Sequence, residues 1–555
     1  MQKYITNIDR LLKQLIILAI LANAVGLIFP LTSISFGPWY GSIAKYIALN
    51  NNWSDLYLSS HDWLDKPHFP FWITAASFKI FGINSFAYMI PGFLFHLIGA
   101  VYTYKLTNYL YNNKTTSLLA TLIYLTVFHL MMSSIDVRAE AYLLGQIIPA
   151  TYYWLQYDRK FTWQALLLGS FFTGLGLMTK GIFVIITIVS GVFALWIYEK
   201  RLINVISPKW WLALTLSFVF ATPEVVALYL QFDLHPEKII FGHTHVSGVR
   251  WFFIDSQFGR FFGSGYIHST NPPPLHQLFF VHTFLWSFLP WTFVYPYAVY
   301  SSIRNFKIQS TENKRNIVFL LGSFWISFVM FSVTTFQVDH YTNIIFPFAA
   351  ILCAGILTPL LNKNHPIFKL QQKLSIFILV IVAIIVGAAF KGLPLVLLVS
   401  FEIVLLLSLV KNWGQMPSIK AIMLSVSAIC LVIVVFEVLG GVIYHRYDAA
   451  YYAAQTTSKN PQIPVVDYKY DSRTLEFYVH NKYNLAQQIQ DIPNYSEFYV
   501  VTDSKNSAEI YQAYPQAQLI TTLHGNTPEN VLPNIVSADK LQAHLESFSV
   551  IYVRK

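Results

Sequence analysis

The sequence is poor in charge and in cysteine. Charged residues make up 12% of the 555 residues, whereas hydrophobic residues make up 55% and aromatic residues 17%. So little charge cannot cover a soluble globule of this size, and we therefore expect an integral membrane protein. The two cysteines, Cys353 and Cys430, both fall inside apolar runs. Their position excludes a disulfide framework for any part of the chain outside the membrane.

Nucleotide-binding and zinc-binding signatures are also missing. The chain contains no GxGxxG, no Walker loop and no zinc-spaced CxxC, so nucleotide-driven chemistry has no support. The formal net charge of +10 comes mostly from lysines and arginines that lie between apolar runs. This distribution indicates membrane topology rather than nucleic-acid binding.

The apolar runs have the length that a bilayer requires, about 20 residues each. They begin with residues 11–31 and recur as far as residue 441. The first lacks the cleavage site of a signal peptide, so we expect it to remain as an anchor. The predicted fold class is mainly α: a polytopic membrane protein of about 13 transmembrane helices, followed by a small C-terminal α/β domain.

Basic residues predict the orientation of the spans, because they concentrate in every second connection. By the positive-inside rule these connections, and with them the N-terminus, are cytoplasmic. An odd number of spans then places the C-terminal domain outside the cytoplasm. The basic residues on this side are Lys3, Arg10, Lys13, Lys105, Lys114, Arg159, Lys160, Lys200, Arg201, Lys209, Arg304, Lys307, Lys314, Arg315, Lys363, Lys369, Lys373, Lys411 and Lys420.

The opposite connections are long and chemically varied, which predicts that function lies on the outer face. We assign residues 1–443 to a transmembrane domain with outer loops 32–70 and 231–274. Within the first loop, residues 40–49 and 71–83 are expected to form short helices in the membrane interface.

The composition changes from about residue 444 onward, where apolar runs shrink to strand length. We expect residues 444–555 to form a soluble α/β domain with its own core. The predicted strands cover residues 464–470, 475–480, 497–502, 518–523 and 547–553, and the predicted helices cover residues 507–513 and 538–546. No catalytic motif is visible in this part of the sequence.

Residues 61–72 (HDWLDKPHFPFW) place two carboxylates, a lysine and two histidines among aromatic residues at a membrane surface. Ionisable groups beside hydrocarbon usually mark a site; the alternative is a solvated loop with interfacial aromatics. Further basic residues face the same side, namely Arg138, Lys180, Arg250 and Arg260. Each could snorkel by itself, but together they suit a phosphate. A phosphate attached to a long isoprenoid would hold its headgroup at this depth.

Several motifs in chain order carry a family resemblance. They are residues 63–72, Phe78-Lys-Ile-Phe-Gly-Ile-Asn84, Met178-Thr-Lys-Gly181, Arg260-Phe261 with His268, Phe288-Leu-Pro-Trp291, Asp339-His-Tyr341 and Phe346-Pro347. Taken together the chain resembles the aminoarabinose transferase and protein mannosyltransferase superfamily over nearly its whole length. The resemblance implies a polytopic glycosyltransferase that uses a polyprenyl-phosphate-linked sugar and no required cofactor.

By position, Lys66, Arg260 and Tyr341 resemble the donor-phosphate ligands of the family. Charge and topology add Arg138 and Lys180 to this set. The resemblance implies that the sugar passes to lipid A or another acceptor outside the cytoplasm, and that the protein lies in the plasma membrane, the inner membrane of a bacterium. Because cations aimed at developing charge dominate catalysis of this kind, these residues are the core of the predicted site.

The chain departs from the family pattern in the first outer loop. Members typically carry an Asp-Glu pair a few residues before a tyrosine, and here the stretch reads Ser35-Phe-Gly-Pro-Trp-Tyr40. A neutral hydroxyl acceptor needs a general base, and Asp136 and Glu140 are the predicted substitutes. Two alternatives remain open: an acceptor that is itself an anionic phosphate, or a protein that binds the lipid without catalysis.

A structural divalent metal ion is a separate hypothesis. Asp65, His268 and His340 are of the right ligand types and lie on outer loops, although histidines on this face are also explained by hydrogen bonding. Two functions from different classes therefore stand: the glycosyltransferase, and a transporter or catalytically silent polyprenyl-phosphate-binding protein. The sequence has no internal repeat of the kind found in transporters, which favours the transferase.

Overall fold

The computed structural model describes residues 2–32, 35–59, 61–262, 275–389, 416–525 and 545–555. The helices up to the middle of the chain are α1 (Gln2–Ala24), α2 (Gly37–Asn50), α3 (Phe69–Phe81), α4 (Ser85–Tyr111), α5 (Lys114–Leu125), α6 (Phe128–Ser133), α7 (Ala139–Arg159), α8 (Trp163–Lys180), α9 (Phe183–Tyr198), α10 (Pro208–Phe220), α11 (Thr222–Leu228), α12 (Gly248–Arg250) and α13 (Ser256–Phe262). The later helices are α14 (Phe279–Ser287), α15 (Val294–Arg304), α16 (Thr311–Val333), α17 (Phe346–Leu357), α18 (Pro366–Ala389), α20 (Pro417–Val438), α21 (Ala449–Thr457), α22 (Arg473–Tyr478) and α23 (Ser507–Ala513).

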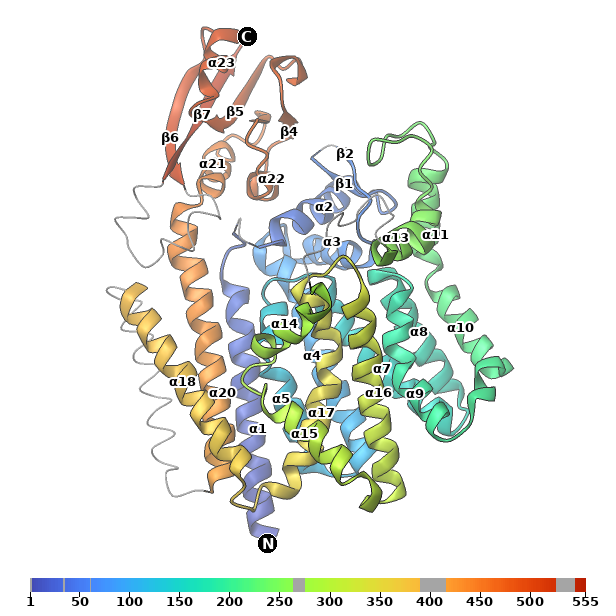
Figure 1. The fold of residues 1–555 in the computed structure, drawn as a ribbon. Helices are drawn as coiled ribbons and strands as arrows, with labels where there is room; N and C mark the ends of the chain where they lie inside the picture. The colour runs from blue at the N-terminus through green and yellow to red at the C-terminus, as the bar shows by residue number, and fades with distance from the viewer. Residues whose placement is uncertain (1, 33–34, 60, 263–274, 390–415, 526–544) are drawn as a thin grey trace.

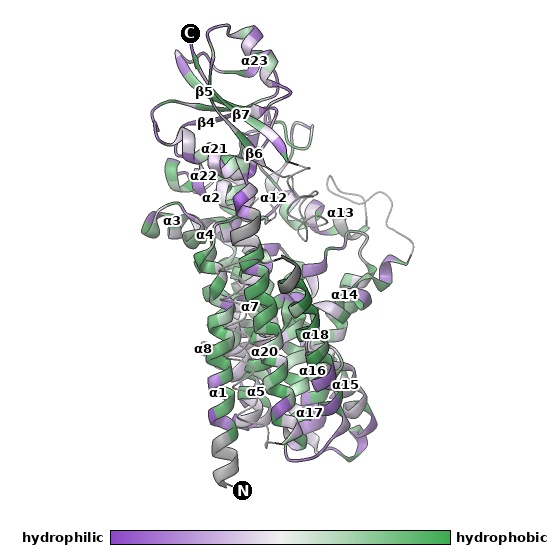
Figure 2. Ribbon diagram, turned by 90° about the vertical axis from the view of Figure 1, so that its left-hand side faces the viewer, coloured by the Kyte–Doolittle hydropathy of each residue, from purple (hydrophilic) through white to green (hydrophobic). Residues whose placement is uncertain are grey.

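The helices form a long bundle, with the N-terminus at one end and a five-stranded sheet beyond the other (Figure 1). We call the second end the sheet end. Hydrophobic residues run along the bundle and hydrophilic residues gather toward its ends (Figure 2). This is the pattern expected of helices surrounded by lipid, whose backbone groups must be satisfied within each helix.

Among the described residues, six helices are long and apolar enough to cross a membrane, or seven if the bent pair Pro208–Phe220 and Thr222–Asp233 counts as one span. Shorter or more polar segments, such as the 12-residue α5 and the charged α7, are not among the six. The prediction of a mainly helical multi-pass protein is confirmed. The count of about 13 spans is not established by these helices.

Helices α2 and α3 lie across the sheet end of the bundle, between it and the sheet (Figure 1). They confirm the helices predicted over residues 40–49 and 71–83. Their place in the membrane interface stays a prediction. A buried pair fixes the start of α3: Glu224 accepts hydrogen bonds from the backbone amide of His68 (2.9 Å) and from its Nδ1 (3.0 Å). Both side chains are fully buried. Glu224 therefore anchors the first loop through His68.

The sheet has the order β4-β3-β5-β7-β6, formed by β3 (Val465–Tyr468), β4 (Tyr483–Ala486), β5 (Glu497–Asp503), β6 (Gln518–Gly525) and β7 (Glu546–Arg554). Strands β4, β3 and β5 run parallel, and β7 pairs antiparallel with both β5 and β6. Consecutive residues of β3 pack on opposite faces of the sheet: Val465 with α21 and α22, and Val466 with α23. We call the sheet with these three helices the sheet module. A two-residue pair, β1 (Tyr57–Leu58) and β2 (His61–Asp62), forms a separate hairpin in the first loop.

The strand predicted over residues 475–480 is wrong, because this segment forms helix α22. The Ser472 hydroxyl accepts the Leu475 amide and caps the helix N-terminus, a local interaction that favours helix over strand. The predicted helix over residues 538–546 lies outside the described residues except at its end, where Glu546 begins β7. Strand β4 was not predicted.

The sheet module is fastened to α2 by a lysine. Lys45 of α2 donates to the backbone carbonyls of Glu476 (2.7 Å), Phe477 (3.1 Å) and Val479 (2.5 Å), at the carbonyl end of α22. A cation at this end of a helix is favourable because the last carbonyls lack partners within the helix. Gly41, one turn earlier on α2, leaves room for the Phe477 ring, which a β-carbon there would meet at 2.7 Å.

Candidate functional site

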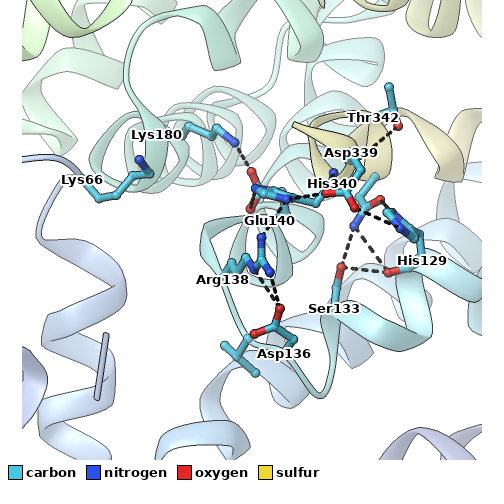
Figure 3. Close-up of polar contacts among 12 residues, drawn as sticks. Lys66, His129, Ser133, Asp136, Arg138, Glu140, Lys180, Asp339, His340 and Thr342 are labelled. Atoms are coloured by element: carbon cyan, nitrogen blue, oxygen red, sulfur yellow. Dashed lines mark hydrogen bonds and ion pairs between the residues drawn. The ribbon is translucent and has the colours of Figure 1, made fainter. Parts of the chain in front are cut away.

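The predicted site residues converge at the sheet end of the bundle, below α2 and α3. The segment between α6 and α7 supplies Asp136 and Arg138, the first turn of α7 supplies Glu140, and the last turn of α8 supplies Lys180. The 3₁₀ turn η7 (Asp339–Ile345) completes the set (Figure 3). These segments are about 40 to 200 residues apart in sequence.

The site is an alternating network of opposite charges. Lys180 donates to Glu140, whose side chain is 3% exposed. Arg138 holds Asp136 with its Nε (2.9 Å) and Nη2 (2.5 Å) and donates from Nη1 to Nδ1 of His340 (3.0 Å). His340 in turn lies 3.7 Å from Glu140 through its Nε2. The two acids predicted as general bases are therefore both paired with a cation.

A second layer of polar groups supports this network. His129 of α6 donates to the side-chain oxygen of Asn343 (2.9 Å), and Asn343 donates to Ser133 (2.6 Å). His129 also lies 4.0 Å from Asp339. Neither His129 nor Asn343 was predicted as a site residue. The only signal for them was the spacing of His129 and Ser133, one helical turn apart directly before Asp136.

Two hollows lie on either side of the Lys180–Glu140 ion pair. The ionic hollow has a volume of about 240 Å³ and is lined by the charged residues from Asp136 to Glu140 together with His129, Trp286, Asp339, His340 and Asn343. The apolar hollow has a volume of about 100 Å³ and is lined by Phe183, Val184, Met330, Phe331, Phe336, Tyr341 and Ile344, with Lys180 at its polar edge. The ammonium of Lys180 lies 3.9 Å from the centre of the Tyr341 ring. Lys180 thus lines the apolar hollow, and its ion-pair partner Glu140 lines the ionic one.

The glycine after Lys180 explains why the motif reads Thr-Lys-Gly. Gly181 has a φ of +92°, and a β-carbon there would lie 2.4 Å from the side-chain nitrogen of Gln257. Gln257 belongs to α13 and donates to the Lys180 carbonyl (3.3 Å). Without a side chain at residue 181, α13 can rest against the end of α8.

The structure describes the surroundings of two predicted donor-phosphate ligands, Lys66 and Arg260, only in part. Lys66 pairs with the adjacent Asp65 at 2.7 Å, and the view in Figure 3 has it on the Lys180 side of the network. Arg260 belongs to α13, three residues after Gln257, so its backbone lies near Lys180. Its side chain lies outside what the structure describes.

The predicted metal ligands do not form a visible cluster. Among the described residues, no group of three or more histidine, cysteine, aspartate or glutamate side chains could hold a metal ion. Asp65 pairs with Lys66, His340 bonds to Arg138, and His268 lies outside the described residues. The metal hypothesis and the expectation that no cofactor is required both stay predictions.

The whole fold resembles that of solved polytopic membrane proteins. ArnT from Cupriavidus metallidurans in the apo state superposes with a TM-score of 0.70 and 14% identity, covering 97% of both chains. The same protein bound to undecaprenyl phosphate gives a TM-score of 0.69 and 13% identity. The class that the fold defines is therefore a helical membrane protein with an appended sheet module.

Sequence comparisons show which proteins parts of the chain resemble. The family model described as dolichyl-phosphate-mannose-protein mannosyltransferase matches residues 65–226. The undecaprenyl phosphate-alpha-4-amino-4-deoxy-L-arabinose arabinosyl transferase of Wigglesworthia glossinidia brevipalpis is 22% identical over 341 residues. That of Yersinia pestis (strain Pestoides F) is 29% identical over 171 residues. The chain is thus similar, over part of its length, to proteins of the aminoarabinose transferase and protein mannosyltransferase superfamily.

The extent of these sequence matches is partial. The match to the Wigglesworthia protein covers 60% of this chain and 56% of that relative, and the match to the Yersinia protein covers 29% and 30%. The chain thus spans little more than half the length of the first of these relatives. The family model begins at Asp65, at the start of the Asp-Lys-Pro motif, and contains Asp136, Arg138, Glu140 and Lys180.

Proposed function

We propose that the protein is an integral membrane glycosyltransferase that moves a sugar from a polyprenyl-phosphate donor to an acceptor outside the cytoplasm, with lipid A as the first acceptor to test. The observation that carries this proposal is the Lys180–Glu140 ion pair, whose lysine lines an apolar hollow and whose glutamate lines an ionic one. An isoprenoid phosphate has the same division, with an apolar tail and an anionic head. The relatives that are named as undecaprenyl-phosphate-dependent transferases support the same chemistry.

The reaction breaks the bond between the anomeric carbon of the sugar and a phosphate oxygen. Negative charge then develops on the phosphate, so cations fixed beside that oxygen lower the barrier. We assign this role to Lys180 and Lys66, with Tyr341 and Arg260 as further ligands. In the structure, the Lys180 ammonium forms an ion pair with the Glu140 carboxylate. The donor phosphate must therefore displace or share that ion pair when it binds.

The orientation of the protein follows from the same assignment. The sheet end carries the site and the sheet module, so we propose that this end faces outside the cytoplasm and the N-terminus faces inside, in the inner membrane of a bacterium. Residues 1–443 would then form the transferase domain and residues 444–555 an outer domain. Labelling of single introduced cysteines with a membrane-impermeant reagent tests this topology.

A direct assay tests the activity. Purified protein in nanodiscs is supplied with an undecaprenyl-phosphate-linked aminosugar and lipid A, and the product is followed by mass spectrometry. We expect transfer by the natural protein and loss of transfer in Lys66→Ala and Arg260→Ala, with expression retained. Normal turnover in both variants would reject the assigned ligands. No transfer, under conditions where ArnT from Cupriavidus metallidurans is active, would reject the function with this donor and acceptor.

A second candidate is a protein that binds the lipid without catalysis. It is favoured by one observation: Asp136 and Glu140, the acids predicted as bases, are both neutralised by neighbouring cations. Binding of undecaprenyl phosphate with no transfer to any acceptor would support it.

A further inference from the structure

Glu437 is a buried carboxyl that the proposed site does not yet use. It is the penultimate residue of α20, is 6% exposed, and forms no hydrogen bond or ion pair within the described part of the chain. A charge kept beside hydrocarbon without a partner is costly, so such residues usually have a functional role. A π-helical turn, η9 (Leu439–Tyr444), begins two residues later. Turns of this kind are rare and often occur at functional sites.

The carboxyl of Glu437 faces a hollow of about 130 Å³, which we call the acid hollow. Asp136 and Ser35 line it together with Glu437, and most of the remaining lining is apolar or glycine. Gly26 lies directly against the carboxyl, since a β-carbon there would be 3.1 Å from Oε2 of Glu437. Glycine at residue 26 therefore keeps space open in front of the acid.

The acid hollow adjoins two larger spaces, with which it shares lining residues. It shares Met132 and Asp136 with the ionic hollow that contains Arg138 and Glu140. It shares Phe29 and Pro30 with a third hollow of about 500 Å³, which lies between the bundle and the sheet module. Part of the lining of the third hollow is apolar, and the rest consists of polar and aromatic groups without lysine or arginine: Asn84, Ser85, His445, Tyr451, Gln455, Tyr478 and His480. Amides, hydroxyls and aromatic rings suit a sugar-bearing headgroup better than a second phosphate, which would call for arginine or lysine.

The pairing of the other acids singles out Glu437. Asp136 is held by Arg138, and Glu140 by Lys180, so both are poor proton acceptors while those pairs last. Asp339, on the ionic hollow, is hydrogen-bonded to His340. Among the described carboxyls that line these hollows, Glu437 is the one with no hydrogen bond or ion pair. A proton acceptor must be unpaired and within reach of the hydroxyl that it deprotonates.

We propose that the acceptor enters through the hollow beneath the sheet module and that Glu437 is the general base that deprotonates its hydroxyl. This inference rests on the proposed transferase function. The acceptor oxygen bonds to the anomeric carbon while its proton passes to the Glu437 carboxylate. The bond from the anomeric carbon to the phosphate breaks, and its electron pair stays on the phosphate oxygen, facing Lys180.

The groups that face Glu437 define how its titration is to be interpreted. Asp136 is the one other titratable side chain in the described lining of the acid hollow, and Arg138 lies behind it. The described lining residues from η1 (Val25–Ile28), α4 and η9 carry no charge. A change in the pH profile on substitution of Glu437 is therefore to be compared with the same profile in Asp136→Asn.

The test uses Glu437→Gln and Glu437→Asp in the transfer assay, with undecaprenyl phosphate binding and melting temperature measured on the same preparations. In Glu437→Gln we expect kcat to fall by about 100-fold or more, the acidic limb of the pH profile to disappear, and binding to stay within about twofold. Glu437→Asp is expected to keep the acidic limb with reduced turnover. Glu312→Gln makes the same chemical change at an exposed pair with Arg159 and serves as the matched control.

Two outcomes would overturn the inference: normal turnover in Glu437→Gln, or a loss of undecaprenyl phosphate binding that accounts for the lost activity. If transfer depends on Lys180 but not on Glu437, the inference fails and the proposed function stands. If the natural protein transfers no sugar at all, the proposed function itself fails.

Discussion

Replacing Lys180 by methionine tests the site at the residue on which the proposal depends most. Methionine keeps the length and apolar character of the side chain and removes the charge. Loss of one preorganised group that stabilises transition-state charge typically lowers kcat by about 100- to 1,000-fold, or about 2.7–4 kcal/mol. We expect a fall of this size in kcat/KM for the lipid-linked sugar, with weaker binding of undecaprenyl phosphate.

The same substitution also leaves the Glu140 carboxylate without the Lys180 ammonium. Its side chain is 3% exposed and that of Lys180 is 21% exposed, so the pair is nearly buried. Removal of one partner of a buried pair costs about 3–5 kcal/mol of stability, and partial exposure of the lysine favours the lower end. A reduced melting temperature in detergent is therefore expected in Lys180→Met, and it must be separated from the effect on catalysis.

The double variant Lys180→Met/Glu140→Gln makes that separation. It removes both charges, so it should recover most of the melting temperature and leave activity low, because the phosphate still lacks its cation. Recovery of activity in the double variant would refute the reasoning, since Lys180 would then serve only to neutralise Glu140. Lys79→Met is the matched control, because Lys79 is an exposed lysine at the end of α3 that bonds to Asn51.

Three further substitutions test other parts of the structure. Glu224→Gln should lower the melting temperature by weakening the buried pair with His68, at a cost of about 3–5 kcal/mol; turnover per folded molecule should hold, and lost turnover at an unchanged melting temperature would contradict this structural role. Lys45→Met should loosen the sheet module, seen as faster release by limited proteolysis, and an unchanged cleavage rate would exclude the anchor. Arg138→Lys keeps the charge but cannot grip Asp136 with two N–H groups; transfer should fall roughly tenfold, or about 1.4 kcal/mol, and unchanged turnover would count against the bidentate contact.

Much of the fold was predictable because hydrophobic length and periodicity report it directly. Helices α2 and α3 followed from short apolar segments rich in aromatics beside a span, and β3, β5, β6 and β7 followed from runs of strand length. The strand prediction for residues 475–480 failed because an apolar pattern of six residues suits either a strand or a helix. The N-cap at Ser472 favours the helix. Such short runs are ambiguous by pattern alone.

The site was predictable as a set of residues and not as a set of pairs. Charge type and topology indicated Arg138, Glu140 and Lys180, which the fold brings together. The sequence could not reveal that Lys180 pairs with Glu140 across 40 residues, or that Arg138 reaches His340 across 202. The predicted convergence of cations is instead an array in which acids and bases alternate. Long-range pairing of this kind depends on helix packing, which no local pattern encodes.

The path of the chain after Glu437 has a mechanical consequence. Helix α20 passes into the π-helical turn η9 and the 3₁₀ turn η10 (His445–Tyr447), and α21 begins two residues later. A short, almost continuous helical connection therefore links Glu437 to the sheet module. Bends in helices concentrate at π-turns. A rotation of the sheet module relative to the bundle should therefore first change the backbone conformation next to Glu437. A crosslink between the sheet module and α2 would prevent this rotation.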